Sequence, residues 1–329
     1  MLTKNHKRLI LSIFDFLFSS FIWYVNASWG NFFLICLILS ITTFLIIFTP
    51  FEIYWSFRDI WFDRWPKLFL KEISISRVKI KINNKFLVAN LLIHKDQNLR
   101  ESKNTIIIIS PGFSDDKLKL QYYYYPLASQ GYIILTYDAR GIGESRKAGK
   151  RTDFIKRIED YKAIIEWVKR KENFKNMKIY AVGFSIGAVT VLSGSFTDKD
   201  VKKIIAISSI SNYKKTLPKF NLFILFLYFF KGVKLFITDE ENELLSPYLI
   251  INDFKNSVPM EIWQNYSNRI LLIHTRNDKV IKVRNFYENA KILELSEKNK
   301  LIFKRGGHVL KKNELSLVAT SLYFFNNPE

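Results

Sequence analysis

The 329-residue sequence predicts an α/β fold, with a mostly parallel central sheet, helices on both faces and an N-terminal transmembrane helical segment. Three observations support this class. Short apolar, β-branched runs alternate with helical stretches from residue 75 onward, which is typical of parallel strands joined by crossover helices. Two long apolar runs fill the first fifty residues. Finally, about 60 residues separate two of the strand runs, too many for a simple crossover, so we expect a lid or cap insertion.

The two N-terminal apolar runs cover residues 9–25 and 32–48, and Asp15 is the acidic exception in the first. Each run is about 17 residues long, near the lower limit for crossing a bilayer. Basic residues precede the first run and follow the second, so the positive-inside rule places both ends in the cytoplasm. We therefore expect residues 1–50 to form a helical hairpin that anchors a cytoplasmic domain.

A signal peptide is the alternative for this segment. The basic residues at 4–8, the first apolar run and the small side chains around residues 25–27 are similar to a secretory leader with its cleavage site. Asp15 disfavours a leader core. After cleavage, the second run would still anchor the protein, and the following domain would face outward.

Residues 51–74 carry aromatic side chains at helical spacing: Tyr54, Phe57, Trp61 and Trp65. Such a pattern fits an interfacial linker helix at the membrane surface. It fits equally well a helix that packs its aromatic stripe on a globular domain.

The remaining segment, residues 75–329, begins with a predicted β-hairpin around Asn83-Asn84, whose strands cover residues 78–82 and 86–92. Buried strands are then predicted at residues 105–110, 133–137, 178–182, 203–208, 269–274 and 300–303. Helices are predicted at residues 118–130, 152–171, 186–195, 283–295 and 314–326.

The cap insertion is expected at residues 213–265, and it contains the apolar run 220–230 (FNLFILFLYFF). This run is too short to span a bilayer. It fits a lid helix over an apolar pocket or a helix that dips into the membrane. A buried helix of the insertion is the plainer interpretation.

The sharpest motif is Gly183-Phe184-Ser185-Ile186-Gly187, directly after one predicted strand and directly before a helix. This is G-x-S-x-G in the strand–turn–helix context that marks a nucleophile. Glycines at 183 and 187 allow the tight turn, in which side chains would collide with neighbouring backbone. We expect Ser185 to be the nucleophile; a structural serine in a strand–helix turn is the alternative.

A serine nucleophile needs a general base, and the chain has four histidines. His6 precedes the first apolar run, His94 follows the early hairpin, and His274 lies within a predicted strand as a structural residue. His308 follows the last strand in a loop with two glycines, which can bring an imidazole to the carboxyl edge of the sheet. His308 is therefore the expected base.

The base in turn needs a carboxylate to orient it. Asp278 follows the strand at 269–274 and gives the chain order Ser, Asp, His that this architecture requires. Asp253 and Glu261 are weaker candidates because they lie in the insertion. A solvated loop aspartate is the alternative for Asp278.

With these motifs together, residues 75–327 resemble the α/β-hydrolase superfamily, in the branch of acylglycerol lipases and serine aminopeptidase-like hydrolases. The segments that carry the resemblance are Ser110-Pro111-Gly112-Phe113, Tyr137–Ser145 (YDARGIGES), the serine turn, Asp278 and Gly307-His308. The resemblance implies an α/β-hydrolase fold and an oxyanion hole built from the backbone N–H groups of Phe113 and Ile186. It also implies a structural role for residues 138–145.

The resemblance implies a serine hydrolase that cleaves a carboxylic ester or thioester through an acyl-enzyme. Together with the predicted N-terminal hairpin, it leads us to expect a membrane-anchored enzyme with its catalytic domain in the cytoplasm. The anchor and the apolar insertion favour a lipid-like or acyl substrate. A serine peptidase would need an acidic pocket for a peptide amine, and the acidic stretch at 239–243 is more typical of a solvated surface. A membrane binding protein that kept the fold without the activity is the other alternative.

Composition limits the possible partners. The net charge of +20 favours an anionic membrane surface or nucleic acid, but basic residues are scattered in pairs and no nucleic-acid module is present. One cysteine and four histidines leave little for a metal site, and no dinucleotide or phosphate loop is found. We expect the lipid bilayer and a small acyl substrate as partners, no nucleic acid and no cofactor; the oligomeric state is left open.

Overall fold

The structure, a computed structural model, describes residues 4–30, 32–61, 71–216, 232–234 and 236–327. The chain divides into two compact units, Met1–Arg64 and Trp65–Glu329. The apolar run at 220–230 of the expected cap lies outside the described residues.

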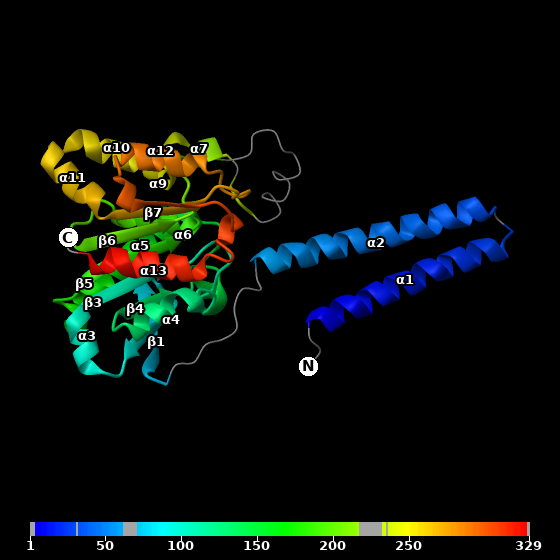
Figure 1. The fold of residues 1–329 in the computed structure, drawn as a ribbon, viewed down its shortest axis with the longest axis horizontal. Helices are drawn as coiled ribbons and strands as arrows, with labels where there is room; N and C mark the ends of the chain where they lie inside the picture. Colours follow the sequence, from blue (N-terminus) through cyan, green and yellow to red (C-terminus); the bar gives the residue numbers. More distant parts are fainter. Residues whose placement is uncertain (1–3, 31, 62–70, 217–231, 235, 328–329) are drawn as a thin grey trace. The chain divides into compact units, whose positions relative to one another are not determined.

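The first unit is a helical hairpin. Helix α1 (Lys4–Ser28) and helix α2 (Phe33–Trp61) lie side by side (Figure 1), and Ser40 Oγ donates a hydrogen bond across the hairpin to the Ser19 carbonyl oxygen at 2.7 Å. Two segments, Leu9–Ser28 and Phe33–Tyr54, are long and apolar enough to cross a membrane, with mean hydropathies of 1.6 and 2.5. These segments are compatible with membrane anchoring, although a signal sequence has the same length and composition.

Helix α2 continues through Pro50, so the boundary expected at residue 50 falls inside one helix. Tyr54 is exposed on this helix, whereas the side chains of Phe57 and Trp61 and all of Trp65 lie outside the described part of the structure. Proline is tolerated within membrane helices more readily than within soluble ones, which fits a helix that runs on past residue 50.

The second unit is built on one eight-stranded sheet of order β1-β2-β4-β3-β5-β6-β7-β8. The strands are β1 (Ile73–Ile82), β2 (Lys85–His94), β3 (Thr105–Ser110), β4 (Ile133–Tyr137), β5 (Lys178–Phe184), β6 (Val201–Ile207), β7 (Ile270–Thr275) and β8 (Lys300–Phe303). The pairs β1–β2 and β2–β4 are antiparallel, and the other five pairs are parallel. The predicted fold class, a leading hairpin followed by a mostly parallel sheet, is confirmed.

Helices cover both faces of this sheet (Figure 1). They are α3 (Gln97–Lys103), α4 (Gln121–Ser129), α5 (Phe154–Arg170), α6 (Ile186–Ser195), α7 (Tyr213–Thr216), α9 (Asp239–Leu245), α10 (Pro247–Ser257), α11 (Met260–Asn268), α12 (Arg284–Ile292) and α13 (Glu314–Asn326). Because side chains alternate along a strand, Ile106 and Ile108 of β3 join the core under α5 and α6, while Ile107 and Ile109 join the core under α4 and α13.

Within the insertion between β6 and β7, the described residues form α7, α9, α10 and α11. Trp263 of α11 is buried in the core beside Phe196, so this end of the insertion packs into the body of the domain. The parallel strands leave their carboxyl ends, and the loops that follow them, at one edge of the sheet, where polar side chains can meet.

Candidate active site

Ser185 occupies a strained turn between β5 and α6. Its backbone has φ 56° and ψ −119°, a conformation that non-glycine residues rarely adopt, and its N–H donates to the Ile207 carbonyl oxygen at 2.8 Å. A Cβ on Gly183 would overlap the backbone of Gly187, and a Cβ on Gly187 would overlap the Ser110 carbonyl oxygen. The two glycines therefore let the backbone close tightly enough to hold Ser185 in this conformation.

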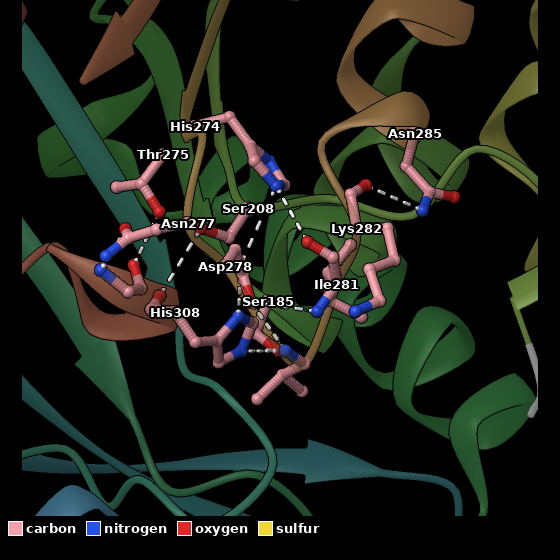
Figure 2. Close-up of polar contacts among 12 residues, drawn as sticks. Ser185, Ser208, His274, Thr275, Asn277, Asp278, Ile281, Lys282, Asn285 and His308 are labelled. Carbon is pink, nitrogen blue, oxygen red and sulfur yellow. Dashed lines mark hydrogen bonds and ion pairs between the residues drawn. The ribbon is translucent and has the colours of Figure 1, made fainter. Parts of the chain in front are cut away.

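The structure brings Ser185, His308 and Asp278 together from the loops after β5, β8 and β7 (Figure 2). His308 Nε2 lies 2.8 Å from Ser185 Oγ, and His308 Nδ1 lies 2.8 Å from Asp278 Oδ2. An ionised carboxylate only accepts hydrogen bonds, so the proton is on Nδ1. Nε2 then offers its lone pair to the serine hydroxyl, which is the arrangement of a nucleophile with its base.

Asp278 is buried and fully hydrogen-bonded rather than solvated. Its Oδ1 accepts the N–H groups of Val280 and Ile281 at 2.8 and 2.9 Å. Burial by itself would raise the pKa of this carboxyl, but the hydrogen bond and charge of His308 and the N–H of Ile281 outweigh it and hold the pKa below its usual value. Asp278 is therefore ionised at neutral pH.

His274 is a second imidazole at the same carboxylate. It is 1% exposed, and its Nε2 lies 2.9 Å from the Ile281 carbonyl oxygen and 3.6 Å from Asp278 Oδ2 (Figure 2). Burial lowers the pKa of His274, which makes the imidazole neutral, with its Nε2 proton donated to Ile281. This bond ties the loop that carries Asp278 back to β7.

Three polar residues that the sequence did not single out hold the His308 loop. Thr275 Oγ1 donates to the Gly307 carbonyl oxygen at 2.8 Å, and Asn277 Oδ1 accepts the Gly307 N–H at 2.9 Å. Ser208 Oγ donates to the His308 carbonyl oxygen at 3.4 Å. Figure 2 shows these side chains around the triad. A polar residue at the carboxyl end of an otherwise apolar strand was the available signal for Thr275 and Ser208.

The two expected oxyanion donors lie on neighbouring segments. The loop with Phe113 packs against the first turn of α6, since a Cβ on Gly187 would also come within 2.6 Å of the Pro111 carbonyl oxygen. The side chains of Phe113 and Ile186 pack against the same apolar cluster. Neither backbone N–H donates to an acceptor among the residues that the structure describes.

The segment 138–145 is structural in this fold, as expected. Asp138 is fully buried and accepts hydrogen bonds from the Lys117 N–H at 2.8 Å, from Lys117 Nζ at 2.7 Å and from the Glu144 N–H at 2.9 Å. Arg140 forms a two-point ion pair with Asp160 of α5, at 2.7 and 2.6 Å.

The other acidic candidates lie elsewhere. Asp253 and Glu261 are exposed on α10 and α11. In the acidic stretch, Asp239 pairs with Lys214, and Glu241 pairs with Lys234 at 2.6 Å while closing the N-terminal cap of α9. Asp239 and Glu241 therefore form ion pairs with lysines of the insertion itself.

The chain is similar to known proteins in sequence and in fold. Residues 101–246 match the family model described as serine aminopeptidase, S33. An uncharacterized 31.7 kDa protein from the traX–finO intergenic region of Escherichia coli is 30% identical over 105 residues. These residues make up 32% of this chain and 37% of that protein, so the match spans little more than a third of the relative's length.

Among solved structures, an esterase of Pyrococcus furiosus aligns with 80% of this chain and 94% of its own, with a TM-score of 0.51 and 20% identity. An acylaminoacyl peptidase of Pyrococcus horikoshii aligns with 79% of this chain and 43% of its own, with a TM-score of 0.54 and 17% identity. A 2,6-dihydroxy-pseudo-oxynicotine hydrolase aligns over 99% and 88%, with a TM-score of 0.56 and 12% identity. At these identities the likeness is one of fold.

Proposed function

We propose that this chain, which has the α/β-hydrolase fold, is a membrane-anchored serine hydrolase that cleaves a carboxylic ester or thioester through an acyl-enzyme on Ser185. The observation that carries the proposal is the unbroken hydrogen-bond chain from Ser185 through His308 to the buried Asp278. A histidine held by a buried carboxylate in this way is the arrangement that activates a serine hydroxyl.

In the proposed reaction, Ser185 Oγ attacks the substrate carbonyl carbon while its proton passes to His308 Nε2. Asp278 holds the imidazole by Nδ1 and stabilises the imidazolium that forms. The negative charge on the carbonyl oxygen is accepted by the N–H groups of Phe113 and Ile186, a type of donor whose loss typically slows the reaction by about 10²–10³. His308 then protonates the leaving alcohol or thiol, and water releases the acid from the acyl-enzyme by the same steps in reverse.

The proposed substrate is lipid-like or acyl, and two features support this. The N-terminal unit holds two segments apolar enough to reside in a bilayer. The residues next to the reacting centre, Phe113 and Ile186, join an apolar cluster with Ile210 and Tyr213 on the side of the insertion. An acyl chain would find apolar contacts there.

A serine peptidase is the second candidate, favoured by the description of the matching family model. Its substrate would need a carboxylate to bind the peptide amine. Among the described carboxylates of the insertion, Asp239 and Glu241 pair with lysines, and the others, Glu240, Glu243, Asp253 and Glu261, are exposed on the surface. The ester or thioester reaction is therefore the better proposal.

A fluorophosphonate probe on the purified full chain in detergent tests the proposal. We expect labelling of the wild type, complete loss in S185A and full labelling in S316A, which removes an exposed serine of α13. D278N should lower kcat about 10³–10⁴-fold, because the imidazole loses the partner that fixes its tautomer. Failure to label a folded wild type would overturn the serine mechanism.

The substrate class is tested in parallel with p-nitrophenyl esters of increasing chain length, an acyl thioester and aminoacyl p-nitroanilides. We expect kcat/KM to favour the esters or the thioester and to rise with chain length as more apolar surface is buried. Preference for an anilide with a free amine would favour the peptidase instead.

A further inference from the structure

Arg157 is a buried cation that the proposed reaction does not yet use. It lies in the first turns of α5 and is 2% exposed. Its Nη2 donates to two successive backbone carbonyl oxygens, those of Pro111 at 2.8 Å and Gly112 at 3.1 Å. Both belong to the loop that follows β3 and leads to Phe113.

The second of these bonds fixes the direction of a particular N–H. The Gly112 carbonyl and the Phe113 N–H belong to the same peptide unit, and the described residues contain no cis peptide bond. In a trans peptide the C=O and the N–H point in opposite directions. Because Arg157 Nη2 binds the Gly112 oxygen, the Phe113 N–H of the same peptide unit points away from the guanidinium.

The serine turn packs against the same loop. The backbone at Gly187 approaches both Ser110 and Pro111 so closely that a Cβ could not fit. The Phe113 N–H makes no hydrogen bond within the described part of the chain. An N–H that is held by its own peptide unit and left unused is a donor ready for a ligand oxygen.

The surroundings keep the guanidinium in place. Burial lowers the pKa of Arg157, and the hydroxyl of Tyr137 and the carboxylates of Asp115 and Asp160 oppose that effect. Phe154, one turn earlier on α5, stacks edge-on against the Phe113 ring with centroids 5.9 Å apart. Helix α5 therefore contacts both the backbone of the loop, through Arg157, and the side chain of Phe113, through Phe154.

We propose that Arg157 is a positioning residue of the oxyanion hole, which aims the Phe113 N–H at the reacting carbonyl by binding the Gly112 oxygen of the same peptide unit. The inference rests on the proposed function, since it assigns a role within that reaction. It predicts an effect on the transition state, where negative charge develops on the carbonyl oxygen, and little effect on substrate binding.

The test compares R157M, R157Q and R157K with R269M in the full-length protein. Arg269 is the matched control, because its guanidinium also donates to backbone carbonyl oxygens, those of Phe196, Asp198 and Val201. It lies at the amino ends of the parallel strands, whereas Ser185 lies at their carboxyl ends. For each variant, kcat and KM on a short p-nitrophenyl ester, the affinity for an alkyl boronic acid, the pH profile and the melting temperature are measured.

We expect R157M and R157Q to lose kcat about 10–100-fold, less than the loss of a whole donor, with KM within about threefold of the wild type. Boronic acid affinity should fall in parallel with kcat, because its tetrahedral adduct with Ser185 uses the same N–H. R157K, which can reach one of the carbonyls, should recover part of the rate. The midpoint of the pH profile should not move, since the triad is untouched, and R269M should lose stability but keep its kcat.

Three results would overturn the inference. A folded R157M that turns over within about twofold of the wild type would show that the bond to Gly112 does not matter. An equal loss of kcat in R269M would make the effect one of general stability. A shifted midpoint of the pH profile would mean that the substitution acts on Ser185, His308 and Asp278 and not on the Phe113 N–H. If R157M does not fold, the activities of R157Q and R157K test the inference by the same criteria. A wild type without esterase activity would overturn the proposed function itself.

Discussion

Asp278 lies between two imidazoles that differ in role. His308 contacts both Ser185 and Asp278, while His274 binds the loop backbone at Ile281. Burial keeps His274 neutral in the folded protein. In the unfolded chain the same imidazole takes up a proton as the pH falls below its ordinary pKa of about 6.5. The two states therefore bind different numbers of protons at mildly acidic pH.

This difference makes folding stability depend on pH. Because the folded pKa of His274 is lowered, its contribution to stability is complete above about pH 6.5 and is lost as the pH falls from there toward the folded pKa. We expect H274Q to be less stable than the wild type by about 1 kcal/mol at pH 7, and the gap to narrow toward pH 5. Urea unfolding at half-unit pH steps measures the difference in free energy of unfolding between the two proteins. A difference that stays constant with pH would contradict a neutral, buried His274.

The sequence was most informative about residues whose chemistry is local. Ser185, Asp278 and His308 could be singled out because a glycine turn or the end of a strand marks each of them. Arg157 and Asn277 could not, because each acts by a hydrogen bond to the backbone of a segment distant in the chain. Nothing in the local pattern distinguishes a carbonyl-binding arginine from the many solvated basic residues of this chain.

At the scale of elements, the segment after β4 is joined to α5 by a buried ion pair. Arg140 and Asp160 are bound at two points, and their side chains are 11% and 5% exposed. Removing one partner of such a pair leaves a buried charge without compensation, which is more damaging than removing both. The pair therefore couples the position of residues 138–145 to the helix that also carries Arg157.

We expect R140M to lower the free energy of unfolding by about 3–5 kcal/mol, because Asp160 stays buried without its partner. The double variant R140M/D160L should recover most of the loss. Denaturant unfolding of the two single variants and the double variant gives the coupling energy. A double variant as unstable as the sum of the singles would mean that the two side chains act independently.

Element boundaries show where sequence reasoning reached its limit. The six parallel strands were predicted because buried strands read as apolar, β-branched runs. A boundary was expected at residue 50 because the second apolar run ends at residue 48, yet α2 passes through Pro50 to Trp61. The cap insertion was expected from chain length alone, which fixes neither its helices nor their packing.

At the scale of the whole molecule, the two units differ in solvent preference. The hairpin exposes large apolar side chains along both helices, whereas the second unit has its own sheet and cores on both faces. A unit with its own core is expected to fold alone. Under the proposed anchoring, the +20 net charge would add an electrostatic attraction to anionic membranes, which weakens as salt is added.

Membrane fractionation distinguishes anchoring by the apolar hairpin from electrostatic attraction to the membrane surface. We expect the full chain to remain with membranes after high salt and alkaline carbonate, and residues 71–329 to be soluble, with kcat/KM on a short ester within about threefold of the full chain. Release of the full chain by salt would contradict a spanning anchor. In intact cells, a C-terminal tag should resist added protease if the catalytic unit is cytoplasmic, and digestion would favour the signal-peptide alternative.

The two edges of the sheet have a consequence for crowding. An edge strand exposes unpaired N–H and C=O groups that can pair with another chain. Here one edge, β8, is only four residues long. The long edge β1 carries the exposed cations Lys79 and Lys81, while its Arg77 pairs with Glu144 at 2.5 Å. Under the proposed anchoring, copies would diffuse in two dimensions and meet more often than free ones. The like charges of Lys79 and Lys81 would keep such encounters brief, so the proposed hydrolase could reach a high density in a bilayer without aggregating through its sheet edges.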